Sequence, residues 1–237
     1  MTKKQKKRVL IKISWEALQW EHDHGIDPHF LHDLAKKISR IKDTWVEIAI
    51  VLGWGNIFRW VSGAAGGMDR TPADYMWMLA TVMNGVAFQD ALQSIWLDAR
   101  LMSALHLPKV AEEYIKQKAN RHLEKWRVII LVAGTGNPYF TTDSAGALRA
   151  LELDCDMLIK ATKVDGVYTK DPKKHDDAEL IKKASYKDVI NKDIRVMDHT
   201  AITLAKDGEL VVKVVNLYKP GSILDAINGK DEGTTIS

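Results

Sequence analysis

A lysine and a serine at the end of the first apolar segment form the first group that could do chemistry. The run Val9–Ser14 is predicted to be a strand, and Lys12, Ile13 and Ser14 close it. A lysine beside a strand-to-loop turn can reach phosphate oxygens as a mobile point charge. The alternative is a solvated lysine on an edge strand, and these residues alone leave both readings open.

A second segment combines glycines with an arginine in the string VLGWGNIFRW, residues 51–60. Backbone N–H groups of a glycine loop can cradle a phosphate when no Cβ blocks its approach. Arg59 would add a bidentate phosphate contact. A plain surface turn is the alternative, because one Gly-rich loop is a weak signal.

The third segment, AGTGNPYFTTDSA, covers residues 133–145 and crowds hydroxyls and an amide around two glycines. This density of small polar groups favours a ligand-binding loop over a plain turn. Asp143 stands at the expected start of the next helix. Its carboxylate could cap that helix, or it could orient a lysine or a metal-bound phosphate.

The fourth segment, KATKVDGVYTKDP, covers residues 160–172 and follows another apolar run. Its Asp-Gly and Asp-Pro pairs are turn dipeptides. Tyr168 within it could pack on a nucleobase or fill the core, and the sequence leaves the two open.

The elements that must position these segments alternate between strands and helices. We expect strands at 9–14, 46–52, 98–103, 127–132, 157–161 and 210–216, and helices at 28–41, 72–95, 111–125, 143–153, 186–191, 198–207 and 223–228. This order predicts an α/β fold, a three-layer α/β/α sandwich around a mostly parallel sheet. Ligands bind beyond the carboxyl ends of such strands. The loops after Ser14, Leu52 and Val132 should therefore share one edge of the sheet.

The composition fits one domain. The chain has 237 residues, a net charge of +3 and a single cysteine, Cys155. We expect a basic arm at 1–8 and one domain at 9–237, in a reducing cytoplasm and without a membrane span. The arm lacks interleaved aromatic residues, so we expect no nucleic-acid partner. We assign no protein metal site, because the cluster of His22, His24, His29 and His32 lacks a regular ligand spacing.

Two common nucleotide-binding motifs are absent, the P-loop G-x-x-x-x-G-K-[ST] and the dinucleotide-binding G-x-G-x-x-G after the first strand. Instead, the helix string MLATVMNG (78–85), the loop 134–145, the segment 160–172 and RVMD (195–198) occur in order. Together these strings resemble the UMP kinase family of the amino-acid-kinase superfamily. The resemblance covers nearly the whole chain.

This resemblance implies the amino-acid-kinase fold, with a UMP-side lobe at about 9–155 and an ATP-side lobe at about 156–230. It implies transfer of the γ-phosphate of ATP to UMP, giving UDP and ADP, with Mg²⁺ as cofactor. It also implies a homohexamer that GTP activates and UTP inhibits. Phosphoryl transfer depends mainly on positioning and charge neutralisation, which suits the lysine, arginine and loops described above.

The resemblance also assigns roles to residues of this chain. The catalytic positions are Lys12, Arg59 and Asp143. The UMP-binding positions are Trp54, Asp74, Thr135, Gly136, Asn137, Pro138, Tyr139, Phe140, Thr141 and Thr142. The ATP-binding positions are Lys12, Ile13, Ser14, Trp15, Gly55, Arg59, Thr162, Tyr168 and Asp171.

All eight tryptophans stand where glycine is expected. Trp45, Trp96 and Trp126 each follow a helix pattern and precede a strand, where the backbone usually turns left-handed and favours glycine. A side chain there costs roughly 1–2 kcal/mol. Trp54 lies between two glycines of a candidate phosphate loop, where an indole would fill the space. The family comparison adds the rest of the set, Trp15, Trp20, Trp60 and Trp77, which match glycines.

Our hypothesis is that UGA codons read as glycine in the source organism were rendered as tryptophan. The alternatives are deliberate engineering and a paralogue that has lost catalysis and only binds nucleotides as a regulator. Drift after such a loss should also have damaged Lys12, Arg59, Asp74 and Asp143, and all four are intact. UGA at the eight codons would support the hypothesis, and UGG there would refute it.

Overall fold

The computed structural model describes residues 6–14, 25–58, 68–170, 172, 174–192, 194 and 196–237. The strands are β1 (Arg8–Ile13), β2 (Glu47–Leu52), β3 (Ala99–Ser103), β4 (Glu112–Glu113), β5 (Val128–Val132), β6 (Met157–Thr162), β7 (Val167–Tyr168), β8 (Leu180–Ile181), β9 (Lys183–Ala184), β10 (Val211–Asn216) and β11 (Thr234–Ile236). The helices are α1 (Pro28–Lys42), α2 (Gly55–Phe58), α4 (Arg70–Ser94), α5 (Lys116–Glu124), α6 (Thr142–Glu152), α7 (Tyr186–Asn191), α8 (His199–Asp207) and α9 (Ser222–Ile227). This order confirms the predicted alternation.

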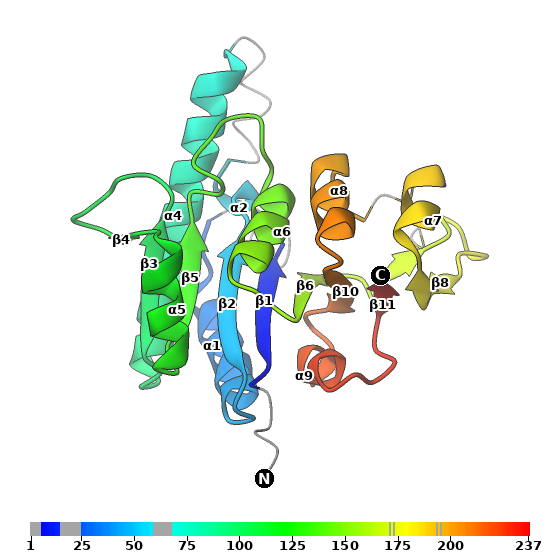
Figure 1. The fold of residues 1–237 in the computed structure, drawn as a ribbon, viewed down its shortest axis with the longest axis horizontal. Coiled ribbons are helices and arrows are strands. Elements are labelled where there is room, and N and C mark those ends of the chain that lie inside the picture. Colours follow the sequence, from blue (N-terminus) through cyan, green and yellow to red (C-terminus); the bar gives the residue numbers. More distant parts are fainter. Residues whose placement is uncertain are drawn as a thin grey trace.

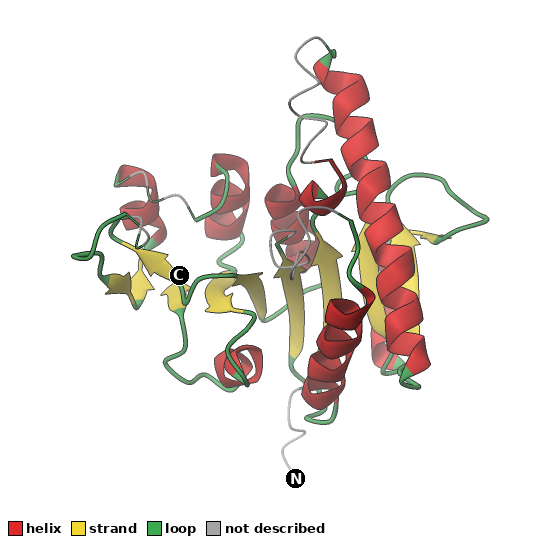
Figure 2. Ribbon diagram, turned by 180° about the vertical axis from the view of Figure 1, so that it is seen from behind, coloured by secondary structure: helices red, strands yellow, loops and turns green. Residues whose placement is uncertain are grey.

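Nine of these strands form one twisted sheet in the order β4-β3-β5-β2-β1-β6-β10-β11-β9. The neighbouring strands run parallel except at β10–β11, which is antiparallel. Helices α1 and α4 cover one face, and α5, α6 and α8 cover the other (Figures 1 and 2). The predicted three-layer sandwich with a mostly parallel sheet is therefore confirmed.

Side chains of each central strand alternate between the two helical layers. In β1, Val9, Ile11 and Ile13 pack with residues of α1, α4 and α9. Leu10 packs instead with residues of α5, α6 and α8. Lys12 has the same parity as Leu10, so its side chain lies on the α6 face of the sheet. The period of two along β1 thus decides which helix the lysine can meet.

Helix α4 packs unusually close to the sheet at Gly85. A Cβ at this position would lie 2.5 Å from Val132 Cγ1 and 2.7 Å from Leu101 Cδ1. Both distances are shorter than atoms can approach, so a side chain would push the helix away from β5 and β3. The glycine of the MLATVMNG string is therefore required by packing.

The predicted helix over 111–125 is wrong in its first part. Glu112 and Glu113 form the short strand β4, which pairs in parallel with Met102 and Ser103 of β3. Helix α5 begins only at Lys116. Pairing with an open sheet edge outweighs the local helical preference of this segment, and such a tertiary effect leaves no local sequence signal.

Three tryptophans adopt the left-handed backbone expected from their sequence positions. Trp45, Trp96 and Trp126 have φ angles of 61°, 64° and 60°. After α4, the N–H groups of Trp96 and Leu97 donate to the carbonyls of Gln93 and Leu92, and Trp126 ends α5 in the same way. This double hydrogen bond is the Schellman motif, in which glycine is usual. Trp15, Trp20 and Trp60 lie outside the described residues.

Replacing Trp96 by glycine should stabilise the fold. The indole is 97% exposed, so its removal leaves no cavity, while glycine relieves the left-handed strain. We expect a gain of about 1 kcal/mol and a rise in Tm of about 2–4 °C, measured by thermal unfolding. Gln93→Gly, inside the same helix, is the control and should lower Tm. A Tm for Trp96→Gly at or below that of the parent would show that the left-handed tryptophan carries no strain.

Candidate active site

Two lysines face each other on neighbouring strands at the carboxyl edge of the sheet. Lys12 of β1 and Lys160 of β6 are direct partners in the parallel register. Their side chains are only 7% and 14% exposed. Like charges directly opposite on one sheet face repel each other and destabilise the pairing. A counter-charge is therefore required at this point.

Asp143, in the first turn of α6, supplies that charge. Its Oδ1 lies 2.8 Å from Lys12 Nζ and its Oδ2 lies 2.8 Å from Lys160 Nζ. Burial by itself would raise the pKa of this carboxyl, but Lys12 and then Lys160 outweigh it and lower the pKa to about 2. Asp143 is thus ionised at neutral pH and joins two ammonium groups in a buried cluster.

The capping interpretation of Asp143 is wrong. Thr141 caps α6, because its hydroxyl oxygen accepts hydrogen bonds from the N–H groups of Asp143 and Ser144. This leaves the Asp143 carboxylate free to orient the lysines, which was the other interpretation. Because Thr141 caps the helix, the carboxylate of Asp143 is available for chemistry.

Sequence reasoning missed Lys160, although the segment 160–172 begins with it. Lys160 Nζ donates to Asp143 Oδ2 and to the carbonyl oxygen of Val196. Burial, followed by the charge of Lys12, lowers the pKa of Lys160 against the opposing effect of Asp143. One signal was present: Lys160 interrupts an apolar strand just before its end, as Lys12 does.

The glycine loop after β2 is held by two buried asparagines. Asn84 of α4 donates its amide to the carbonyl oxygen of Gly53 at 2.7 Å and to Asn56 Oδ1 at 2.8 Å. Asn56 Nδ2 donates back to Asn84 Oδ1 at 2.9 Å. Buried amides paired this way fix one loop conformation. The asparagine of MLATVMNG, which the sequence did not single out, therefore positions the loop that contains Trp54 and Gly55.

The loop after β5 is anchored to the same helix. Thr81 Oγ1 accepts a hydrogen bond from the N–H of Ala133, at 2.8 Å. Ala133, Gly134, Gly136 and Tyr139 have positive φ angles of 58–82°, so the loop turns sharply several times. The two loops thus emerge side by side at the carboxyl edge, as expected. The loop beyond Ser14 lies outside the described residues.

Several residues assigned to UMP surround one small cavity next to this loop. Trp54, Asp74, Phe140, Thr141 and Thr142 line it together with Arg70, Trp77, Met78, Thr81 and Gly134. Asp74 is 3% exposed; both its carboxylate oxygens accept from Arg70 Nε, at 2.8 and 2.7 Å, and the N–H of Tyr139 donates to Oδ2 at 2.6 Å. Arg70 is a site residue that the sequence reasoning missed.

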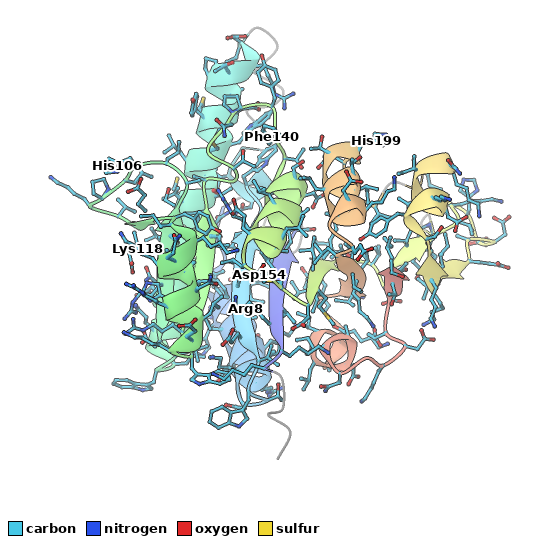
Figure 3. All side chains as sticks on the ribbon, viewed as in Figure 1. Arg8, His106, Lys118, Phe140, Asp154 and His199 are labelled. Atoms are coloured by element: carbon cyan, nitrogen blue, oxygen red, sulfur yellow. The ribbon has the colours of Figure 1, made fainter. Side chains whose placement is uncertain are left out.

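The remaining loop residues lie next to the cavity but do not line it. Thr135 Oγ1 and the Asn137 backbone hydrogen-bond within the loop, and Asn137 is exposed. Gly136 and Pro138 are half-buried. Figure 3 shows Phe140 at the carboxyl end of the sheet, while Arg8 lies toward the opposite edge. The structure therefore brings five of the ten UMP-assigned residues into one cavity wall.

The ATP-assigned residues that the structure describes lie at the ends of β1, β2 and β6 and in β7. Ile13 is buried at the end of β1, Ser14 Oγ accepts from Lys12 Nζ at 3.3 Å, and Gly55 begins α2. Thr162 ends β6, and Tyr168 in β7 lines a cavity of about 900 Å³ with Gly166, Lys183 and Asp188. Trp15, Arg59 and Asp171 lie outside the described residues.

Asp198 lies between the starts of α6 and α8 and was also missed by the sequence reasoning. Its carboxylate accepts hydrogen bonds from the hydroxyls of Thr141, the N-cap of α6, and of Ser144 in α6, and from the N–H of Ala201 in α8. The same segment offers the Val196 carbonyl to Lys160. The string RVMD therefore connects the start of α6 to the start of α8. The two ammonium groups of Lys12 and Lys160 can hold two anionic groups close together, which phosphoryl transfer requires.

Removing the charge of Asp143 should destabilise the protein in a pH-dependent way. Asp143→Asn leaves two buried lysines without their counter-ion, so we expect a loss of about 3 kcal/mol in the free energy of unfolding at pH 7. The folded pKa of Asp143 is below its ordinary value, so this stability is present above about pH 4 and lost toward pH 2. The difference in the free energy of unfolding between parent and variant, measured by urea unfolding, should therefore become smaller as the pH falls.

Asp98→Asn is the matched control, because Asp98 is half-exposed and pairs with Arg127 at the surface. It should cost less than about 1 kcal/mol. An Asp143→Asn gap that stays constant from pH 7 to pH 3 would contradict the charged cluster.

Comparisons with known proteins agree with this architecture. The amino acid kinase family profile matches residues 7–216. The UMP kinase from Bacillus anthracis is 36% identical, with a TM-score of 0.93 over 98% of this chain and 96% of that one. The UMP kinase from Ureaplasma parvum is 35% identical, with a TM-score of 0.91 over 98% and 99%.

A more distant structure, the uridylate kinase from Archaeoglobus fulgidus, is 23% identical with a TM-score of 0.71 over 97% of this chain and 99% of that one, and it supports the fold alone. No helix in the described part of the chain is long and apolar enough to cross a membrane. The matched profile, the two near relatives and the lysine–aspartate–lysine site together lead to one assignment: this chain is an enzyme of the amino acid kinase family.

Proposed function

We propose that this chain is a UMP kinase, which transfers the γ-phosphoryl group of ATP to UMP and yields UDP and ADP. The observation that carries the proposal is the Lys12–Asp143–Lys160 cluster, which holds two ammonium groups together at the carboxyl edge of the sheet. UMP as acceptor is supported by the two near relatives, both described as UMP kinases.

In this proposal the lysines neutralise charge and no general base acts. The UMP phosphate is already anionic, so its oxygen can attack the γ-phosphorus directly, and the bond from that phosphorus to the β-bridging oxygen breaks. Lys12 and Lys160 would stabilise the negative charge on the transferring group. Asp143 would keep the two ammonium groups in place, while Arg59 would add a phosphate contact.

The cofactor in this proposal is Mg²⁺ that arrives with ATP. Mg²⁺ is usually held by substrate phosphates and water with one or two carboxylates. Asp143 is engaged by two lysines, and no group of three or more His, Cys, Asp or Glu residues suited to a metal occurs among the described residues. In this proposal the ATP phosphates carry the ion, which would neutralise part of their negative charge.

Substrate contacts in this proposal are those that the family resemblance assigns. Asp74 and the loop 135–142 would hold UMP, with Asp74 on the ribose, and Trp54 stands at the phosphate loop. Ile13, Ser14, Trp15 and Gly55 would contact the ATP phosphates. Thr162, Tyr168 and Asp171 would contact its adenosine. The lobe boundary near residue 155 and the cytoplasmic location stay predictions.

A second candidate is a catalytically impaired, nucleotide-binding regulator on the same fold. The observation that favours it is the pair of indoles from Trp54 and Trp77. Both line the small cavity beside Asp74, Thr141 and Thr142, which we call the acceptor-side cavity. The hypothesis that these tryptophans are misread glycine codons stays a proposal that coding DNA would decide. We therefore expect activity from a version with glycine at all eight positions, and little from the version with tryptophan.

The two candidates are separated by a product assay. Purified all-glycine protein is incubated with MgATP and, in parallel, UMP, CMP, AMP, aspartate or carbamate, and products are resolved by anion-exchange chromatography. We expect UDP from UMP and roughly 100-fold less turnover after Lys12→Met or Lys160→Met. Lys118→Met on α5 is the control. Nucleotide binding without any product would favour the regulator, and product from another acceptor alone would refute UMP as substrate.

We also propose that the chain forms a homohexamer, controlled by GTP as activator and UTP as inhibitor. Support for self-association comes from α4, whose outer face exposes Tyr75, Leu79, Met83 and Val86. These residues recur every three or four positions and so form one apolar stripe along α4. Helix α4 is the longest helix among the described residues (Figure 1). An exposed stripe of this kind is typical of a covered interface.

Charges placed in the stripe should break the assembly. Leu79→Arg with Met83→Arg would bury two charges if the stripe is covered by a second copy, so we expect a smaller particle by light scattering after size exclusion. Gln93→Arg, exposed on the same helix, should leave the mass unchanged. An unchanged mass for the double variant would refute the stripe as an interface.

A further inference from the structure

We infer that the stacked indoles of Trp54 and Trp77 plug the acceptor-side cavity, so that an acceptor of nucleotide size enters only when the stack is removed. The inference rests on the proposed function for the identity of that acceptor. The plug itself follows from contacts in this chain.

The two indoles lie face to face. Their ring centroids are 4.6 Å apart and the ring planes differ by 9°. Trp54 comes from the loop after β2, and Trp77 comes from the second turn of α4. Both rings line the same cavity as Asp74, Thr141 and Thr142. Stacked aromatic pairs are favourable beyond the area that they bury, so the pair favours the closed arrangement.

Arg70 adds two cation–π contacts beside the stack. Its guanidinium lies 5.4 Å from the Trp77 ring centroid and 5.5 Å from that of Tyr139. Both distances are within cation–π range. The same arginine donates hydrogen bonds to both carboxylate oxygens of Asp74. Asp74 is the residue proposed to bind the ribose of UMP. The plug thus covers the space for the acceptor and also engages the residue that should bind it.

The remaining space is too small for a nucleotide. The acceptor-side cavity has a volume of about 70 Å³, room for a few water molecules. Small-molecule sites usually measure about 300–1,000 Å³. The donor-side cavity around Tyr168, at about 900 Å³, lies within that range. The obstruction is therefore specific to the acceptor side.

The five tryptophans within the described residues divide into two physical classes. Positive φ angles occur at Trp45, Trp96 and Trp126. The φ angle is not positive at Trp54 or Trp77. An alanine at position 54 or 77 therefore removes the indole without backbone strain, and alanine also suits the α4 interior. Substitution at these two positions tests the plug separately from the helix-end strain.

The test measures UMP affinity by isothermal titration calorimetry. The proteins are the parent, Trp54→Ala, Trp77→Ala, the double variant and Trp96→Ala, an exposed-indole control distant from the cavity in the chain. We expect at least tenfold tighter UMP binding in the double variant, smaller gains in the single variants, and no change in the control. Equal UMP affinity in parent and double variant would overturn the inference.

Two further readouts separate this inference from the proposed function. A non-hydrolysable ATP analogue should bind parent and double variant equally, because the donor side is unobstructed. Tighter UMP binding by the double variant supports the plug whether or not UDP forms, and rapid UDP formation by the parent refutes the plug. The kinase proposal is refuted separately, by the absence of UDP formation in the all-glycine protein. If the double variant does not fold, Trp54→Ala alone decides: a threefold gain in UMP affinity supports the plug, and no gain overturns it.

Discussion

The site depends on one buried carboxylate between two buried ammonium groups. Lys12 and Lys160 are register partners on adjacent parallel strands, an arrangement that would repel without Asp143. Because the carboxylate offers one oxygen to each lysine, it fixes the distance between them. The parity of β1, the register of β1 with β6 and the cap at Thr141 must all be right for this cluster to form. The two ammonium groups are therefore already close together before an anionic ligand binds.

Helix α4 is the scaffold on which the site is built. It lies against the sheet because Gly85 has no side chain. From that position, Asn84 holds the loop after β2 and Thr81 holds the loop after β5. Asp74, two turns earlier, reaches the loop at Tyr139. The opposite face of the same helix carries the apolar stripe proposed for assembly. The helix that holds the binding loops is therefore also the one that carries the stripe proposed for assembly.

The tryptophans within the described residues act on stability and on substrate binding in two different ways. Those at helix ends hold a left-handed backbone at a cost in stability, while their rings lie at or near the surface. Those at positions 54 and 77 cost little in backbone strain but fill the space where an acceptor would bind. Stability and substrate binding should therefore respond to different substitutions.

The sequence by itself determined the sheet class, the edge of the sheet that carries the site, and the left-handed backbone at Trp45, Trp96 and Trp126. Each of these follows from local patterns: apolar strands, helix starts and helix ends. Only the tertiary structure decided that Lys160 belongs to the site, that Asp198 joins the start of α6 to the start of α8, and that Glu112 pairs in a strand. These facts depend on strand register and on contacts between residues far apart in the chain, and no local pattern encodes either.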